Sequence, residues 1–183
     1  MSEMIVETSR DGRYRVRLEA DQEPVNPRRD YDHLAHVITV PGSRYLDVDP
    51  DGGPLQEGWD RIKDRSDAPE VFARWAKIFH GAVIVEHTPH EGPRSLWYLL
   101  PEDIQEIGNT PEEALKTEID EYQSWAEGDV WGFIVEKSVD WTRTDDEDET
   151  RTTWEMVDSC WGFIGYRYAE EAAREGFAAY LSA

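Results

Sequence analysis

A large excess of negative charge is the feature that most constrains how this chain can fold. Its 183 residues include 40 Asp and Glu against 19 Lys and Arg, which gives a formal net charge of −21. Highly charged chains that lack apolar surface stay disordered, because they cannot bury enough area to offset the entropy of folding. Eight Trp, eight Tyr and five Phe supply that area here. We therefore expect a folded protein with an acidic surface.

The same charge limits the partners of the protein. Residues 101–183 hold 22 acids and 6 bases, so most of the excess lies in the second part of the chain. Such a field repels nucleic acid and anionic membranes and attracts cationic proteins. We expect no direct nucleic-acid binding, no membrane binding and a cationic protein as the partner. A homodimer is compatible with the sequence.

The absence of export signals predicts a cytoplasmic protein. No apolar run approaches the roughly 18 residues of a membrane span, and Met1-Ser2-Glu3-Met4 does not begin a signal peptide. Cys160 is the only cysteine, which excludes an internal disulfide and fits a reducing compartment. It lies in an apolar run, so we expect it to be buried and inert.

Local signals predict an α+β fold with a mainly antiparallel sheet of about six strands and two or three helices. Asp11-Gly12 joins two strand-like segments as a hairpin turn. The second segment alternates apolar residues with a basic stripe that we expect to pair with carboxylates of the protein itself: Arg13, Arg15 and Arg17. Helical spacing predicts helices near residues 68–79, 111–126 and 169–181, with Asp67 and Thr110 as N-caps.

A repeated tetrapeptide links two of the predicted strands. Trp-Gly-Phe-Ile occurs at residues 131–134 and again at 161–164, and the two copies suit neighbouring strands of one sheet. A glycine in each copy allows a bulge or a close backbone approach. Between the copies, five consecutive acids repel one another and predict a mobile loop near residues 143–151. The whole chain, residues 1–183, is interpreted as a single acidic α+β domain.

The acids can form a recognition surface. Carboxylates three and four residues apart on a helix lie about 5–6 Å apart, a spacing similar to that of phosphates along DNA. A rigid acidic face can therefore occupy a cationic DNA-binding groove of another protein, although acidity also serves solubility alone. The candidate contact residues are Asp120, Glu121, Glu127, Asp145, Asp146, Glu147, Asp148 and Glu149.

Two H-x-x-H pairs support an alternative, a metal-binding module or metal-dependent hydrolase. The pairs are His33 with His36 and His87 with His90, and imidazole nitrogens with carboxylate support suit zinc. The spacing works only where a helix or turn brings both members to one side, because a strand directs them to opposite faces. The chain contains no nucleophile elbow, phosphate loop or H-E-x-x-H motif. A non-enzymatic protein without a cofactor is therefore favoured.

Three segments resemble a family of small proteins from bacteriophages and actinobacterial mobile elements. They are residues 21–34 with their Asn-Pro-Arg, the Gly-Asp-Val-Trp-Gly-Phe of residues 128–133, and the Asp-Ser-Cys-Trp-Gly-Phe of residues 158–163. Arg44-Tyr45 matches a further turn of the family, whereas Ala35 replaces its small glycine after Leu34. The family is uncharacterised, so the resemblance supplies no catalytic residues.

The resemblance implies a phage accessory role in the cytoplasm of a host cell. By analogy with other small acidic phage proteins, we expect an inhibitor that mimics DNA and blocks a cationic site on a host nucleic-acid enzyme. Restriction and CRISPR nucleases are the expected targets, which makes the protein an anti-restriction or anti-CRISPR candidate. An accessory role without any nuclease partner is a further alternative.

Overall fold

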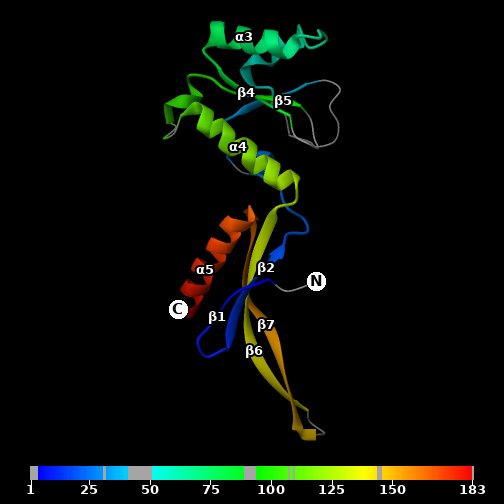
Figure 1. Ribbon diagram of the computed structural model, residues 1–183, viewed down its shortest axis with the longest axis vertical. Helices are drawn as coiled ribbons and strands as arrows, with labels where there is room; N and C mark the ends of the chain where they lie inside the picture. The colour runs from blue at the N-terminus through cyan, green and yellow to red at the C-terminus, as the bar shows by residue number, and fades with distance from the viewer. Residues whose placement is uncertain are drawn as a thin grey trace. The chain divides into compact units, whose positions relative to one another are not determined.

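A computed structural model describes most of the chain (Figure 1). The described residues are 4–30, 32–40, 51–88, 94–106, 108, 110–143 and 146–182, and for residues 30, 106, 142–143 and 146–150 the description covers the backbone only. They form seven strands in two antiparallel sheets together with helices. The α+β class with antiparallel pairing is as predicted, but the strands form two sheets instead of one.

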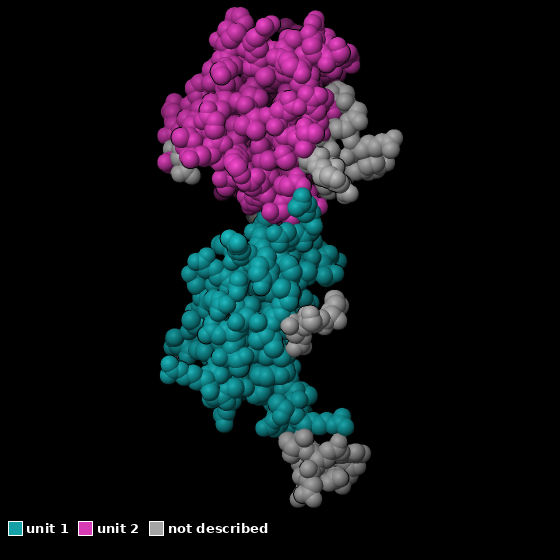
Figure 2. Space-filling view, in the orientation of Figure 1, with its two compact units in different colours: residues 1–24, 127–183 teal, residues 25–126 magenta. Residues whose placement is uncertain are grey.

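The chain, interpreted from the sequence as one domain, divides into two compact units (Figure 2). Unit 1 combines residues 1–24 with residues 127–183, and unit 2 comprises residues 25–126. Each unit has its own sheet and its own hydrophobic core.

Unit 1 is a four-stranded sheet in the order β1-β2-β6-β7, with one helix on it. Its elements are β1 (Met4–Thr8), β2 (Tyr14–Ala20), β6 (Val130–Arg143), β7 (Asp146–Ile164) and α5 (Tyr166–Ser182). Gly12, with φ 72°, occupies the predicted hairpin turn between β1 and β2. One sheet face packs on α5 through the core residues Val16, Leu18, Phe133, Val135, Ala169, Ala173 and Phe177. The alanines let the helix lie close to the sheet.

The two Trp-Gly-Phe-Ile copies are neighbours, as predicted. β6 and β7 pair antiparallel, with Trp131 opposite Phe163 and Phe133 opposite Cys160. The register shifts between these pairs, so a bulge lies at the glycines of the repeat. The expectation that Cys160 is buried is wrong, since this residue is exposed.

Unit 2 is a three-stranded sheet, β3-β5-β4, with helices on both faces. Its elements are α1 (Pro27–Asp30), β3 (His36–Thr39), η1 (Gly53–Leu55), α2 (Gln56–Asp60), α3 (Ala68–His80), β4 (Val83–His87), β5 (Ser95–Leu99), η2 (Asp103–Glu106) and α4 (Pro111–Ala126). The central strand β5 is buried throughout. Leu96 and Tyr98 pack with α2 and α3, whereas Trp97 and Leu99 pack with α4.

The two predicted helix caps differ in the structure. Thr110 forms the predicted capping box, because its Oγ1 accepts a hydrogen bond from Glu113 N at 3.3 Å and Glu113 Oε2 accepts one from Thr110 N at 3.0 Å. Asp67 occupies the N-cap position of α3 but makes no side-chain cap hydrogen bond. Its carboxylate instead accepts two hydrogen bonds from Arg65.

Among the described residues, no helix is both long and apolar enough to cross a membrane.

Candidate functional site

The β6–β7 hairpin extends beyond the sheet of unit 1 as a two-stranded arm. β2 pairs with β6 only as far as Tyr14 opposite Lys137, and Ser138 N donates a last hydrogen bond to Arg13 O at 2.8 Å. The pairing of β6 with β7 continues to Arg143 opposite Asp146. We call residues 139–153 the arm. Each strand of the arm has only the other as its partner among the described strands.

The arm carries most of the acids that the sequence analysis selected. It contains six acids and two bases. Residues 146–149, expected in a mobile loop, belong to strand β7, whereas Asp145 lies outside the described residues. Threonines with high strand propensity flank the acids, and Thr142 pairs with Thr150. Register also places Arg143 opposite Asp146.

Polar bonds across the strands hold the base of the arm. Trp141 Nε1 donates a hydrogen bond to Thr153 Oγ1 at 2.8 Å, and Thr152 Oγ1 donates one to Asp140 Oδ1 at 2.7 Å. The Trp141 side chain is nevertheless 56% exposed. An exposed tryptophan among acids is typical of a protein-binding surface, since tryptophan is enriched among the residues that dominate interface energies.

Helix α4 presents a second group of the predicted acids in unit 2. Asp120 is exposed and forms an ion pair with Lys116 one turn earlier. Glu121 is partly buried, and burial together with the nearby Glu118 raises its pKa. Glu127 is exposed and belongs to unit 1, so the predicted contact residues are distributed over both units.

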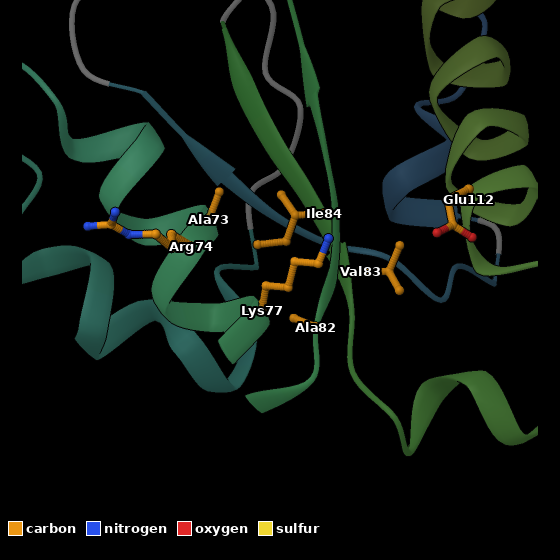
Figure 3. A pocket seen from close by; sticks show the side chains of 7 residues that line it. All are labelled: Ala73, Arg74, Lys77, Ala82, Val83, Ile84 and Glu112. Atoms are coloured by element: carbon orange, nitrogen blue, oxygen red, sulfur yellow. The ribbon is translucent and has the colours of Figure 1, made fainter. Parts of the chain in front are cut away.

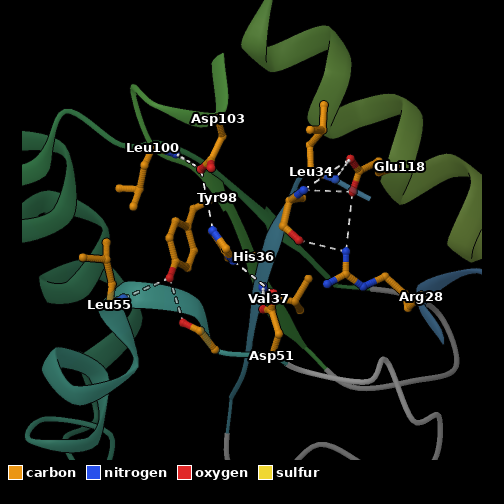
Figure 4. A network of polar contacts seen from close by, with 12 residues as sticks. Arg28, Leu34, His36, Val37, Asp51, Leu55, Tyr98, Leu100, Asp103 and Glu118 are labelled. Atoms are coloured by element: carbon orange, nitrogen blue, oxygen red, sulfur yellow. Dashed lines mark hydrogen bonds and ion pairs between the residues drawn. The ribbon is translucent and has the colours of Figure 1, made fainter. Parts of the chain in front are cut away.

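Glu118 of α4 holds the segment before β3 (Figure 4). Its carboxylate accepts hydrogen bonds from Leu34 N at 2.8 Å and from Ala35 N, and it lies 3.5 Å from Arg28 Nη1. The same Arg28 nitrogen donates to Ala35 O at 2.9 Å. This acid therefore has a structural role, which the helical pattern of charges does not reveal.

His36 is the centre of a polar network at the start of β3 (Figure 4). Its Nδ1 lies 3.0 Å from Asp51 Oδ2, and its Nε2 lies 3.6 Å from Asp103 Oδ2. The hydrogen bond to Asp51 raises the pKa of His36, with a smaller opposing effect of burial. Burial alone would raise the pKa of Asp51, but its bonds to His36 and to Val37 N lower it.

Tyr98 closes this network on the core side. Its hydroxyl donates a hydrogen bond to Gly52 O at 2.7 Å and accepts one from Leu55 N at 3.1 Å. Burial raises the pKa of Tyr98 to about 12, so the hydroxyl keeps its proton. Both carboxylates of the network also bind backbone N–H groups, those of Val37 and Leu100. The network therefore ties β3 to η1 and η2.

The structure does not bring the two predicted H-x-x-H pairs together. His36 pairs with Tyr98 on the face of the sheet toward α3, whereas His87 pairs with Ser95 on the face toward α4. His87 Nε2 lies 3.1 Å from Gln123 Oε1 of α4. His33 lies before β3, and His90 lies outside the described residues. Within the described part of the chain, no three His, Cys, Asp or Glu residues form a group that could hold a metal ion.

Unit 2 also has a surface cavity of about 360 Å³ between α3, β4 and the start of α4 (Figure 3). Its wall is mainly apolar, and Lys77 extends across it toward β4, whereas Arg74 points away. Glu112 lies on the α4 side. The lining residues include no histidine, cysteine or hydroxyl side chain, and their charged groups are those of Arg74, Lys77 and Glu112.

Comparison with known proteins adds no further constraint on function: no family model, curated protein or solved structure matches this chain.

Proposed function

We propose that this protein is a non-enzymatic acidic inhibitor that occupies a cationic nucleic-acid-binding site of another protein. The arm is the part that we assign to this contact, with exposed acids elsewhere contributing through their field. The expected partner is a host nucleic-acid enzyme of the restriction or CRISPR nuclease type, in line with the resemblance to phage proteins.

The observation that supports this proposal is the position of the acidic run at the end of the β6–β7 hairpin. Residues 146–149 are four consecutive acids in strand β7. A strand rises about 3.4 Å per residue, and one strand of duplex DNA carries one charge per about 3.4 Å of axis. Four consecutive acids therefore give the end of the arm a local density of negative charge of the order of that of a DNA strand, although the register shift between Asp146 and Thr150 interrupts the regular spacing.

The shape of the arm also suits insertion into a groove. A two-stranded β-ribbon is narrow enough to enter the major groove of DNA, so it also fits a protein groove of similar width. Trp141 adds an apolar anchor beside the acids, where its exposed ring can enter a pocket of the partner. The bonds of Trp141 and Thr152 across the two strands reduce the ordering that binding would require.

The test is capture of the partner by the full chain from a bacterial lysate, followed by elution with salt. We expect a nucleic-acid-binding enzyme to be retained at low salt and released as screening increases, since its contacts are mainly electrostatic. The recovered enzyme should then lose DNA binding when the protein is added. Recovery of no such enzyme would leave the alternative of an accessory protein without a nuclease partner.

A charge-neutral arm provides the matched control. We expect the quadruple variant Asp146→Asn, Glu147→Gln, Asp148→Asn and Glu149→Gln to keep its fold and to lose the partner. The same number of amide substitutions at Glu170, Glu171, Glu175 and Glu112 removes equal charge from helices α5 and α4. If both variants lose the partner equally, total charge and not the arm is responsible, and the proposed contact is wrong.

A further inference from the structure

The sheet of unit 1 has one covered face and one open face. Helix α5 packs on the face that carries Val16 and Leu18. No other helix of unit 1 is present among the described residues to pack on the opposite side. We call that side the open face and define it by Ile5, Arg15, Arg17, Ile134, Glu136, Trp154, Met156 and Trp161.

Strand register places these residues on one side. In β2, residues alternate between faces, so Arg15 and Arg17 point away from the core that contains Val16 and Leu18. Arg17 lies between Ile5 of β1 and Ile134 of β6. In the next row, Arg15 lies beside Glu136, which pairs with Met156 of β7.

The two tryptophans of β7 complete the open face. The Trp154 ring lies under the guanidinium of Arg15, with Arg15 Cζ 4.3 Å from the ring centroid. Trp161 lies over the backbone of Gly132, which pairs with Glu19 of β2 on the same side. Three apolar side chains of the open face are exposed to solvent around the buried Arg15 and Glu136: Ile5 is 51%, Met156 65% and Trp161 43% exposed.

The open face is electrically balanced, although the chain as a whole has a large net negative charge. Glu136 Oε2 lies 2.6 Å from Arg15 Nε, and Glu136 Oε1 lies 3.1 Å from Arg17 Nε. Arg17 also forms an ion pair with Glu19. Two arginines thus face two glutamates in a molecule with a net charge of −21. Trp, Met and Arg are also the residue types that are enriched in protein–protein interfaces.

We propose that the open face is the interface of a homodimer, in which two copies pack sheet against sheet. A cationic partner would be drawn to the acidic surfaces, and an anionic partner would be repelled by the field of the whole chain. A second copy presents the same open face, which is balanced in charge and partly apolar. Contact through this face therefore brings two acidic copies together without placing acidic surfaces against each other. A two-fold axis allows one patch to serve both sides, and packed sheets lie about 10 Å apart.

Salt should strengthen this dimer, whereas it should weaken the complex with the cationic partner. The failure of one proposal can therefore be distinguished from the failure of the other. Screening weakens the repulsion between two acidic copies but leaves the apolar contact intact. We expect sedimentation velocity of the full chain to show more dimer at about 500 mM than at about 50 mM NaCl. A monomer at both salt concentrations, up to about 100 μM protein, would overturn the proposal.

A matched pair of tryptophan variants locates the interface. We expect Trp161→Glu to weaken dimerisation at least about tenfold, since truncation or charging of a central aromatic typically costs more than this. Trp141→Glu changes a more exposed tryptophan on the arm and should leave the dimer intact. Ile5→Glu, on the edge strand, tests the same face if Trp161→Glu does not fold. Dimers that resist both open-face variants, or that Trp141→Glu also disrupts, would overturn the assignment.

Discussion

Arg15 Nε lies 2.6 Å from Glu136 Oε2, and both side chains are about nine-tenths buried, with exposed fractions of 10% and 9%. Two of the three arginines of the predicted basic stripe, Arg15 and Arg17, thus pair with carboxylates of the protein itself. A buried charge whose partner is removed is strongly destabilising, because its desolvation is no longer compensated.

We expect Glu136→Gln to lower the free energy of unfolding by about 3 kcal/mol, since it removes the buried carboxylate that Arg15 and Arg17 both contact. Urea denaturation followed by tryptophan fluorescence measures the change. Glu57→Gln removes a carboxylate from the exposed ion pair with Arg61 and serves as the control, with no change expected. Equal effects of the two substitutions would show that burial of the Glu136 pair is energetically unimportant.

A second prediction concerns the close approach of Trp161 to the backbone of Gly132. A Cβ at residue 132 would overlap Cε3 and Cδ2 of the Trp161 ring, so the ring or the strand must shift. We expect Gly132→Ala to destabilise the protein by about 1–3 kcal/mol through overpacking. Gly108→Ala is the matched control, because a Cβ there meets nothing within 4 Å. Combining Gly132→Ala with Trp161→Ala should recover part of the loss, which separates the clash from strand propensity.

The third prediction is a decrease of stability with rising pH through the His36 network. Folded His36 has a raised pKa, so the folded state binds this proton more tightly than the unfolded state. The stabilisation is complete below the unfolded value of about 6.5 and is lost as pH rises through the folded pKa.

Chemical denaturation across this pH range measures the effect as the difference between wild type and variants. The free energy of unfolding of His36→Gln should be lower than that of the wild type at acidic pH and should approach the wild-type value as pH rises. Asp51→Asn should remove the same dependence of the free energy of unfolding on pH, since Asp51 is the main cause of the raised pKa of His36. The double variant should add little to either single change. A difference in the free energy of unfolding between wild type and variants that stays constant with pH would contradict this account.

The parts of the fold that the sequence predicts are those with short-range signals. The Asp11-Gly12 turn and the Thr110 capping box each follow from a few adjacent residues, and the pairing of β6 with β7 follows from their shared Trp-Gly-Phe-Ile. The division into two sheets depends on which strands pair over long separations, and no local pattern specifies it. Asp67 shows a further limit, because Arg65, two residues earlier, binds the side chain that would cap α3.

The candidate site was only partly predictable for related reasons. The acids of residues 146–149 predict a loop if repulsion alone is considered, but the threonines that follow them in β7 and the pairing of β7 with β6 favour a strand. Glu136 was not selected, although a lone acid after Phe133-Ile134-Val135, opposite an arginine stripe, is a signal that could identify it. The H-x-x-H spacing does not reveal that His36 and His87 lie in strands with side chains on opposite faces.

The last prediction is that the arm can be removed without unfolding unit 1. The α5 core involves residues of β6 up to Val135, and the pairing with β2 ends at Lys137. Ser138 and Trp154 face each other in the register, so an Asn-Gly turn between them should close the shortened hairpin. Circular dichroism and urea denaturation should then give an unfolding transition close to that of the wild type.

This deletion also separates the two proposed surfaces. Removal of residues 139–153 takes away six acids and two bases but leaves Trp161, Met156 and Ile5 in place. The shortened protein should therefore lose its cationic partner while it keeps, or strengthens, its self-association at moderate salt, because the repulsion between copies falls with the net charge. An arm deletion that unfolds unit 1 would mean that the two-stranded extension stabilises the sheet, and the arm could then not be treated as a separate binding element.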